Sequence, residues 1–228
     1  MPKNMIRGNT ITVNKKYTTL ESLTCKDFYW HIINVTKHIP TSISKWTAHY
    51  QGFRSAESSV WPRIFKIPFK TVRDTKIQTF QFRVLHRIIP CNYWLHNIKI
   101  KERNTCDYCN NVDDLPHFFL QCPKVTDFWE YWIHWWENIS GIKIENSSVL
   151  SECIIFGFPN DSDVIQVLNY CVLYAKYYIY IQRLYNNKLD LFACLSQLKI
   201  AMEMEYNICK SQNKEKKFEK FNFVYEKL

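Results

Sequence analysis

Apolar residues recur along most of the chain at the spacing of helices rather than of strands. They stand three and four residues apart within 22–38, 74–89, 123–138, 163–185 and 190–210. Because a helix completes a turn every 3.6 residues, this spacing gathers apolar side chains on one face. The pattern predicts a mostly α-helical protein. The presence of only 4 glycines among 228 residues fits this class, because turn-rich folds use glycine more often.

The segment 74–89 predicts the clearest helix. Asp74 can cap its first turn, and Pro90 ends it, because proline disfavours helical backbone in the residue before it. Its broad apolar side holds Ile77, Gln81, Val84, Leu85, Ile88 and Ile89. Another side gathers the basic residues Arg73, Lys76, Arg83 and Arg87, with Phe80 among them. This basic side is either an ordinary solvated face or a surface that contacts phosphate groups.

Helix breakers divide the chain into parts. We expect a tail or strand at 1–21, an irregular helical region at 22–140, a loop at 141–163 and C-terminal helices at 164–228. Within the second part, shorter helices are expected at 43–52 and 92–98, and Pro62 and Pro68 predict an irregular segment. The last part predicts a hairpin of two long helices. The tail after Lys210 either docks on the core or frays.

The helix predicted at 123–138 is very aromatic. Trp129, Trp132 and Trp136 stand three and four residues apart and therefore share a face. Such a stripe is more often part of a core than a platform for a ligand. The acidic residues of the same helix favour the core interpretation, because they would repel phosphate.

Charge is distributed unevenly along the chain. The formal net charge is +9, yet residues 61–105 contain ten Lys or Arg against two Asp or Glu, and residues 106–163 contain two against ten. The first block suits a phosphate-binding face and the second a region that stays away from nucleic acid. Two solvated surfaces would show the same pattern, so charge alone leaves both interpretations open.

The nine cysteines do not form the pattern of a secreted disulfide framework. Their number is odd and they are scattered, and the first residues lack the apolar stretch of a signal peptide. No segment reaches the roughly 18 apolar residues of a membrane span. We therefore expect an intracellular protein, nuclear or cytoplasmic, that contacts no membrane and keeps its thiols reduced and available for metal.

The strongest local motif is CDYCNNVDDLPHFFLQC. Its candidate ligands follow the spacing C-x2-C-x7-H-x4-C and are Cys106, Cys109, His117 and Cys122. The C-x2-C pair directs two thiolates at one ion, and a short helix capped by Asp114 or Asp113 would bring the other two ligands. Three sulfurs and one imidazole give a closed tetrahedral site for one structural zinc ion, with a net charge of −1.

The alternative is that these thiols are simply buried and His117 lies at the start of a helix. The remaining cysteines lack paired spacing and suit core positions. Asp113 and Asp114 form a pair like that of a polymerase palm, but they lie between candidate metal ligands rather than at the tip of a β-hairpin. Glycine-rich phosphate loops, serine elbows and HExxH motifs are absent from the sequence. We therefore expect no enzymatic activity and no small-molecule substrate.

The order of these motifs resembles the C-terminal region of reverse transcriptases from non-LTR (LINE-type) retrotransposons, the reverse transcriptase zinc-binding domain. The matching features are the Leu-His-Arg-Ile step at 85–88, the Cys/His ligands, an aromatic helix starting near Phe128, and the preceding Trp46 and Trp61. The run YAKYYIYIQR resembles the family's C-terminal helix. The resemblance covers about residues 22–210.

This resemblance implies a zinc-stabilised module downstream of a polymerase, which grips template RNA or target DNA. The expected partners are RNA or DNA and a reverse transcriptase polymerase domain. The chain contains no polymerase or endonuclease motif. Basic side chains would contact phosphates, and Phe80, Tyr93 or Trp94 would stack on an unpaired base. The expected contacts are Arg63, Lys66, Lys70, Arg73, Lys76, Phe80, Arg83, Arg87, Trp94, Lys99, Lys101 and Arg103.

A rival hypothesis is a structural or protein-interaction module. In it, zinc and the tryptophan helix build a platform for a polymerase domain or another chain, without nucleic acid. The acidic block at 106–163 favours this hypothesis for the second half of the chain. A nuclease would need Asp161 or Asp163, which lie in no nuclease-like pattern.

Overall fold

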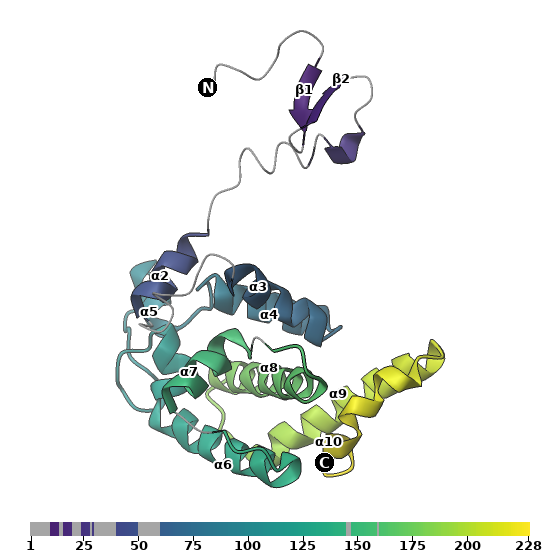
Figure 1. Cartoon of the computed structure of the whole chain (residues 1–228). Coiled ribbons are helices and arrows are strands. Elements are labelled where there is room, and N and C mark those ends of the chain that lie inside the picture. The colour runs from purple at the N-terminus through teal and green to yellow at the C-terminus, as the bar shows by residue number, and fades with distance from the viewer. Residues whose placement is uncertain are drawn as a thin grey trace. The chain divides into compact units, whose positions relative to one another are not determined.

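The computed structural model describes residues 10–13, 16–19, 24–27, 29, 40–49, 60–144, 147–158 and 160–228. The chain forms two compact units, Met1–Thr41 and Ser42–Leu228. In the first unit, β1 (Thr10–Val13) and β2 (Lys16–Thr19) pair antiparallel (Figure 1). Strands thus form in the segment where a tail or strand is expected. The helix expected at 22–38 lies largely outside the described residues.

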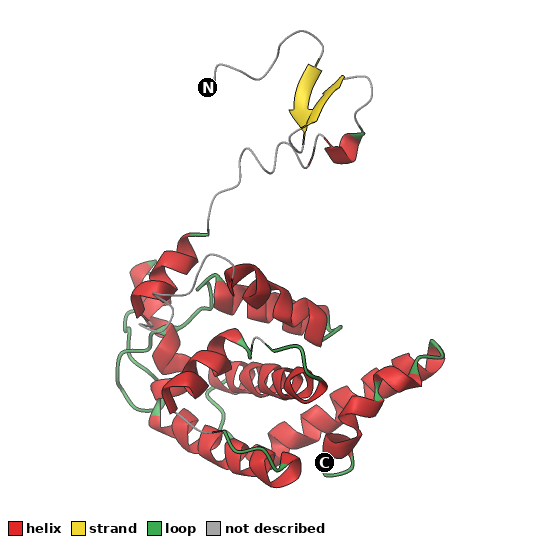
Figure 2. Cartoon of the chain, in the orientation of Figure 1, coloured by secondary structure: helices red, strands yellow, loops and turns green. Residues whose placement is uncertain are grey.

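The second unit is almost entirely helical (Figure 2), which confirms the predicted fold class. Its elements are α2 (Thr41–His49), α3 (Val60–Thr71), α4 (Thr75–Leu85), α5 (Asn92–Asn97), the π-helical turn η3 (His117–Gln121), α6 (Pro123–Ser140), α7 (Ser147–Phe156), α8 (Asp163–Leu184), α9 (Leu191–Ser211), η4 (Glu215–Lys217), η5 (Glu219–Phe221) and α10 (Asn222–Tyr225).

Helix α8 forms the centre of this unit. It is apolar nearly all round, and it contacts α3, α4, α9, η3 and η5 (Figure 1). Its contact with α9 forms the C-terminal hairpin that the sequence predicts. Among the described residues, no helix combines the length and the apolar character that crossing a bilayer requires. The buried residues of α8 and its contacts with the neighbouring helices account for its apolar surface.

The tryptophan stripe of α6 belongs to the core, as its spacing predicts. Trp129, Trp132 and Trp136 are 4%, 1% and 0% exposed. The indole N–H of Trp129 donates to the carbonyl of Phe119 at 2.8 Å. Gly141 ends the helix with a φ of 68°, a left-handed conformation that glycine adopts without strain.

Two segments are more helical than the sequence predicts. Helix α7 occupies the middle of the segment expected as a loop, and α3 continues where Pro62 and Pro68 predict an irregular chain. Pro62 lies in the first turn, where its missing N–H would have no partner inside the helix. The apolar residues of α3, including Ile64 and Ile67, are buried, so packing outweighs the hydrogen bond lost at Pro68.

Helix α4 begins as predicted and ends earlier. Asp74 caps it by accepting a hydrogen bond from the amide of Lys76 at 2.8 Å. The helix stops at Leu85, because Arg87 adopts a φ of 58° that no α-helix can contain. Arg87 therefore does not extend the basic side of α4, contrary to the expectation from helical periodicity.

The C-terminal tail docks on the core. Phe218, Phe221 and Val224 are buried, and the tail contacts α6, α8 and α9. The ring of Phe221 packs edge-on against Tyr170 of α8, with centroids 5.0 Å apart. Burial of these apolar side chains explains why the Lys/Glu-rich tail folds back on the protein.

Candidate metal centre and basic surface

A tight hairpin presents the first two candidate ligands. Thr105 pairs with Val112 across it, and the amide of Asn110 donates to the carbonyl of Cys106 at 2.9 Å. Asn110 closes the turn with a φ of 63°, a conformation that asparagine tolerates better than most residues. The amide of Tyr108 points at the Cys106 sulfur, 3.3 Å away. The local chain thus directs both cysteines of the C-x2-C pair to one side.

The other two ligands flank the turn η3. The side chain of Asp114 accepts a hydrogen bond from the amide of His117 at 2.9 Å, so Asp114, and not Asp113, caps this turn. The imidazole of His117 is 5% exposed, and its Nε2 lies 3.3 Å from the sulfur of Cys109. Cys122 follows the last residue of the turn and is fully buried.

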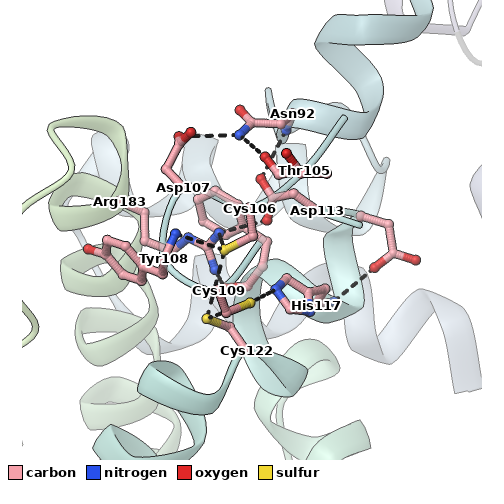
Figure 3. Close-up of polar contacts among 12 residues, drawn as sticks. Asn92, Thr105, Cys106, Asp107, Tyr108, Cys109, Asp113, His117, Cys122 and Arg183 are labelled. Atoms are coloured by element: carbon pink, nitrogen blue, oxygen red, sulfur yellow. Dashed lines mark hydrogen bonds and ion pairs between the residues drawn. The ribbon is translucent and has the colours of Figure 1, made fainter. Parts of the chain in front are cut away.

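Cys106, Cys109, His117 and Cys122 therefore converge on one point (Figure 3). Their ligand atoms all lie within 4.8 Å of one another. The sulfur of Cys122 lies 3.8 Å from that of Cys106 and 3.9 Å from that of Cys109. A tetrahedral zinc ion with Zn–S bonds of about 2.3 Å places its sulfurs about 3.8 Å apart. The four residues fit one zinc ion.

Metal binding at this site would displace a thiol proton. Burial, and then the neighbouring Cys106, raise the pKa of Cys122 to about 12, so a metal-free cluster would keep its thiol proton at neutral pH. Burial lowers the pKa of His117, which favours the neutral imidazole that binds metal. Zinc would be held by three thiolates and this imidazole, and it would supply folding energy to the knuckle.

A buried arginine from α8 supports the centre. Nη2 of Arg183 lies 3.1 Å from the sulfur of Cys106 and 2.6 Å from Oδ1 of Asp113 (Figure 3). The side chains of this ion pair are 4% and 2% exposed. Nη1 of Arg183 donates to the carbonyl of Phe118 at 3.0 Å. The guanidinium offsets the negative charge of the thiolates and of Asp113, and it ties the knuckle to the central helix.

Sequence reasoning missed Arg183, because nothing near the metal motif points to it. The one available signal is the position of Arg183 at the end of an otherwise apolar helix. Charged side chains are rarely buried unless they have a partner, so this position points to one.

Asn92 connects α5 to the same centre. Its amide donates to Oδ2 of Asp113 at 3.0 Å, and its side chain donates to the carbonyl of Thr105 at 2.7 Å. Lys101 donates to the Asn92 side chain at 2.8 Å. Asp113 therefore has both carboxylate oxygens occupied by partners within the protein, which accounts for its burial.

The fold and this site define an α-helical domain organised around one structural zinc ion. Residues 45–129 match the sequence profile of a family described as zinc-binding in reverse transcriptase. The match contains all four ligands and confirms the resemblance that the motifs indicate. No curated protein and no solved structure matches the chain.

The structure divides the predicted nucleic-acid contacts into groups. One group consists of exposed cations that form no salt bridge with any described residue: Arg63, Lys66, Lys76, Arg83, Lys99 and Arg103. Trp94 is 37% exposed and remains available for stacking. These seven side chains keep the accessibility that contact with a ligand requires.

Four other predicted contacts already bind partners inside the protein. Lys70 pairs with Asp161, Arg73 with Glu205 and Lys101 with Asp107, at N···O distances of 3.2, 3.5 and 3.6 Å, and Arg87 lies over the ring of Trp46 at 4.4 Å. The exposed pairs can exchange these partners for phosphate, because surface ion pairs contribute little free energy.

The prediction that Phe80 stacks on a base is wrong. Its ring is 3% exposed, and its centroid lies 5.3 Å from that of Tyr177 and 5.2 Å from that of Tyr180. Helical periodicity correctly places Phe80 beside basic residues. It gives no information on α8, which covers this side of α4 and buries the ring.

Proposed function

We propose that the protein is a zinc-stabilised nucleic-acid-binding module without catalytic activity, which grips template RNA or target DNA beside a reverse transcriptase polymerase. The observation that carries this proposal is the set of six exposed cations within 61–105 that lack acidic partners among the described residues. Phosphate is the anion that such a set suits, and the match to a family described as zinc-binding in reverse transcriptase supports the proposal.

Phosphate contacts release counterions and carry little sequence information. We therefore expect binding to both RNA and DNA, with an affinity that falls steeply with salt. The thiolate ligands must stay reduced, so the nucleus and the cytoplasm are the compartments we expect.

A salt titration tests the proposal. Binding of the zinc-loaded chain to labelled RNA and DNA is measured between low and physiological salt, for the wild type and for a variant with Arg63→Glu, Lys66→Glu and Lys99→Glu. Each lost phosphate contact reduces the slope of log K against log salt by about 0.7 for a single strand. The matched control reverses three exposed cations outside 61–105, namely Lys188, Lys210 and Lys227. Absence of binding at low salt, or equal binding by both variants, contradicts the proposal.

The non-catalytic part has a separate test. Four protein ligands complete a tetrahedral zinc site and leave no position for a reacting water. Labelled RNA and DNA incubated with the protein and Mg²⁺ should remain intact. Cleavage that disappears in Asp161→Ala or Asp163→Ala would overturn this part.

A second candidate function is docking on a polymerase domain, and one observation favours it. Helix α9 exposes large apolar side chains: Phe192, Ile200 and Met204 are 81%, 57% and 61% exposed. Sedimentation with a recombinant reverse transcriptase polymerase domain tests this function. Binding that is lost in Phe192→Asp with Met204→Asp, while nucleic-acid binding is absent, would favour docking over the first candidate.

A further inference from the structure

A groove between α4 and α8 differs from the surroundings of the other exposed cations in 61–105, because it combines positive charge with aromatic rings. It has a volume of about 430 Å³. Lys76 and Arg83 line it from α4, Tyr177 and Tyr180 line it from α8, and Phe80 contributes its floor. None of its described lining residues is acidic. Positive charge and aromatic rings therefore meet at one concave place.

The aromatic rings of the groove are held in place. The rings of Tyr177 and Tyr180 have centroids 6.2 Å apart, and both pack against Phe80. Each tyrosine is half-buried, so one part of each ring is fixed by packing while another part borders the groove. Burial raises the pKa of Tyr180, so its hydroxyl keeps the proton and carries no charge that would repel a phosphate.

The cations of the groove are free to bind an anion. Lys76 and Arg83 are exposed, and neither forms a salt bridge with the part of the chain that the structure describes. They stand seven positions apart in the sequence, which corresponds to about two helical turns, or about 10 Å, along α4. A phosphate chain that passes along the groove can therefore contact both cations.

Two other hollows of the described surface lack this combination. The hollow beside Arg73 is also lined by Glu205 and Glu219, and the hollow beside Tyr108 is lined by Asp107 and Asp127. Carboxylates at these places would repel a phosphate. Charge complementarity thus favours the groove between α4 and α8.

We propose that this groove binds an unpaired nucleotide of a single-stranded nucleic acid, with the base stacked on Tyr177 and Tyr180 and the flanking phosphates held by Lys76 and Arg83. The inference rests on the proposed function and deepens it, because it specifies the strand state and the place of binding. A paired base keeps both faces within the duplex and has none to offer the tyrosines. The groove therefore selects single strands over duplexes.

The test uses fluorescence anisotropy with the zinc-loaded full chain. The probes are a labelled oligouridylate, an oligothymidylate of the same length, and a duplex of mixed sequence. Tyr177→Leu with Tyr180→Leu should weaken single-strand binding about tenfold or more and leave duplex binding unchanged. Tyr177→Phe with Tyr180→Phe keeps the rings and should retain the affinity. Tyr131→Leu, at an exposed tyrosine of the acidic region, is the matched control.

Photo-crosslinking of the wild type gives a readout that does not depend on how the variants fold. An oligonucleotide with 5-iodouridine or 5-iododeoxyuridine should crosslink to Tyr177 or Tyr180, as located by mass spectrometry. If binding is retained but the crosslinks lie at other residues, the groove is not the binding site, whereas the proposed function still stands. Equal weakening of single-strand and duplex binding would also overturn binding in the groove. Absence of binding by any probe at low salt would overturn the proposed function and the groove together.

Discussion

Helix α8 carries two buried basic side chains, Lys176 and Arg183, whose partners differ in charge. Lys176 is fully buried, and its Nζ bonds to Oε1 of Gln81 at 2.6 Å and to the carbonyl of Ile155 at 3.0 Å. Both partners are neutral. Burial lowers the pKa of Lys176 well below its usual value, which favours the uncharged amine, and the lysine joins α4 and α7 to α8 through these two hydrogen bonds.

Arg183 lies two turns further along the same helix, and its partners are negative. It contacts the carboxylate of Asp113 and the sulfur of Cys106. A guanidinium keeps its proton in proteins, so its burial requires compensating charge, which the metal centre supplies. The comparison teaches that the two side chains need different surroundings: the lysine is buried against neutral acceptors, whereas the arginine always stays charged and is buried beside a carboxylate and a sulfur.

Removal of the metal should have the largest effect, and it should affect the metal centre far more than the surroundings of Lys176. Cys106→Ser with Cys109→Ser should reduce the zinc content from about one ion per chain to none. The lost binding free energy is about 10–16 kcal/mol in small zinc-dependent folds. Hydrogen exchange should then increase across 106–122 and change little around Lys176. Elemental analysis and exchange mass spectrometry measure both effects. Cys25→Ser, at an exposed thiol, is the control. A variant that keeps its zinc would contradict the assigned ligands.

Loss of the buried charge at the metal centre should have the next largest effect. Arg183→Met leaves Asp113 buried without its partner and should lower the free energy of unfolding by about 3–5 kcal/mol. Urea unfolding of the zinc-loaded protein measures this loss. Adding Asp113→Asn removes the orphaned charge and should restore part of the stability. A double variant no more stable than Arg183→Met alone would show that the ion pair is not the cause.

The lowered pKa of Lys176 should be visible in the pH dependence of the free energy of unfolding. In the unfolded chain a lysine has a pKa of about 10.4, whereas in the folded protein the pKa of Lys176 is lowered. Between these two values the unfolded state binds more protons, so stability rises with pH, by at most about 1.4 kcal/mol per pH unit. Unfolding measured from pH 7 to pH 10 should show this rise, and Lys176→Met should flatten it. An equal rise in both proteins would assign the effect to other groups.

The exposed pair of Lys70 and Asp161 should show the smallest effect. Their side chains are 60% and 81% exposed, so water and salt screen the attraction. Lys70→Ala should change the free energy of unfolding by less than about 1 kcal/mol, as measured by thermal melts at two salt concentrations. A loss comparable with that of Arg183→Met would erase the contrast between buried and exposed ion pairs.

Local features of the sequence predict a large part of this protein. Helices α4, α6, α8 and α9 follow from apolar periodicity, and the four metal ligands follow from their spacing, because both signals lie within a short stretch of chain. Contacts between distant segments leave no such signal. Arg183 stands 77 residues after Cys106, whose sulfur it contacts. The burial of Phe80 likewise depends on α8, which helical periodicity within α4 cannot indicate.

Helices α3 and α7 also depend on contacts between distant segments, because their local sequence does not predict a helix. Proline in α3 and the mixed composition around α7 predict irregular chain. Burial of residues such as Ile64 and Ile155 nevertheless makes helix the more stable state. Tertiary packing here overrides local propensity, and its strength depends on neighbours that are distant in sequence.

On α8, Tyr177, Tyr180 and Arg183 stand three residues apart, so one stretch of helix serves both the groove and the metal centre. Inserting or deleting a single residue between Tyr180 and Arg183 would turn one end against the other by about 100°. The tyrosines and the arginine could then no longer reach their places together. The length of this stretch is therefore not free to change.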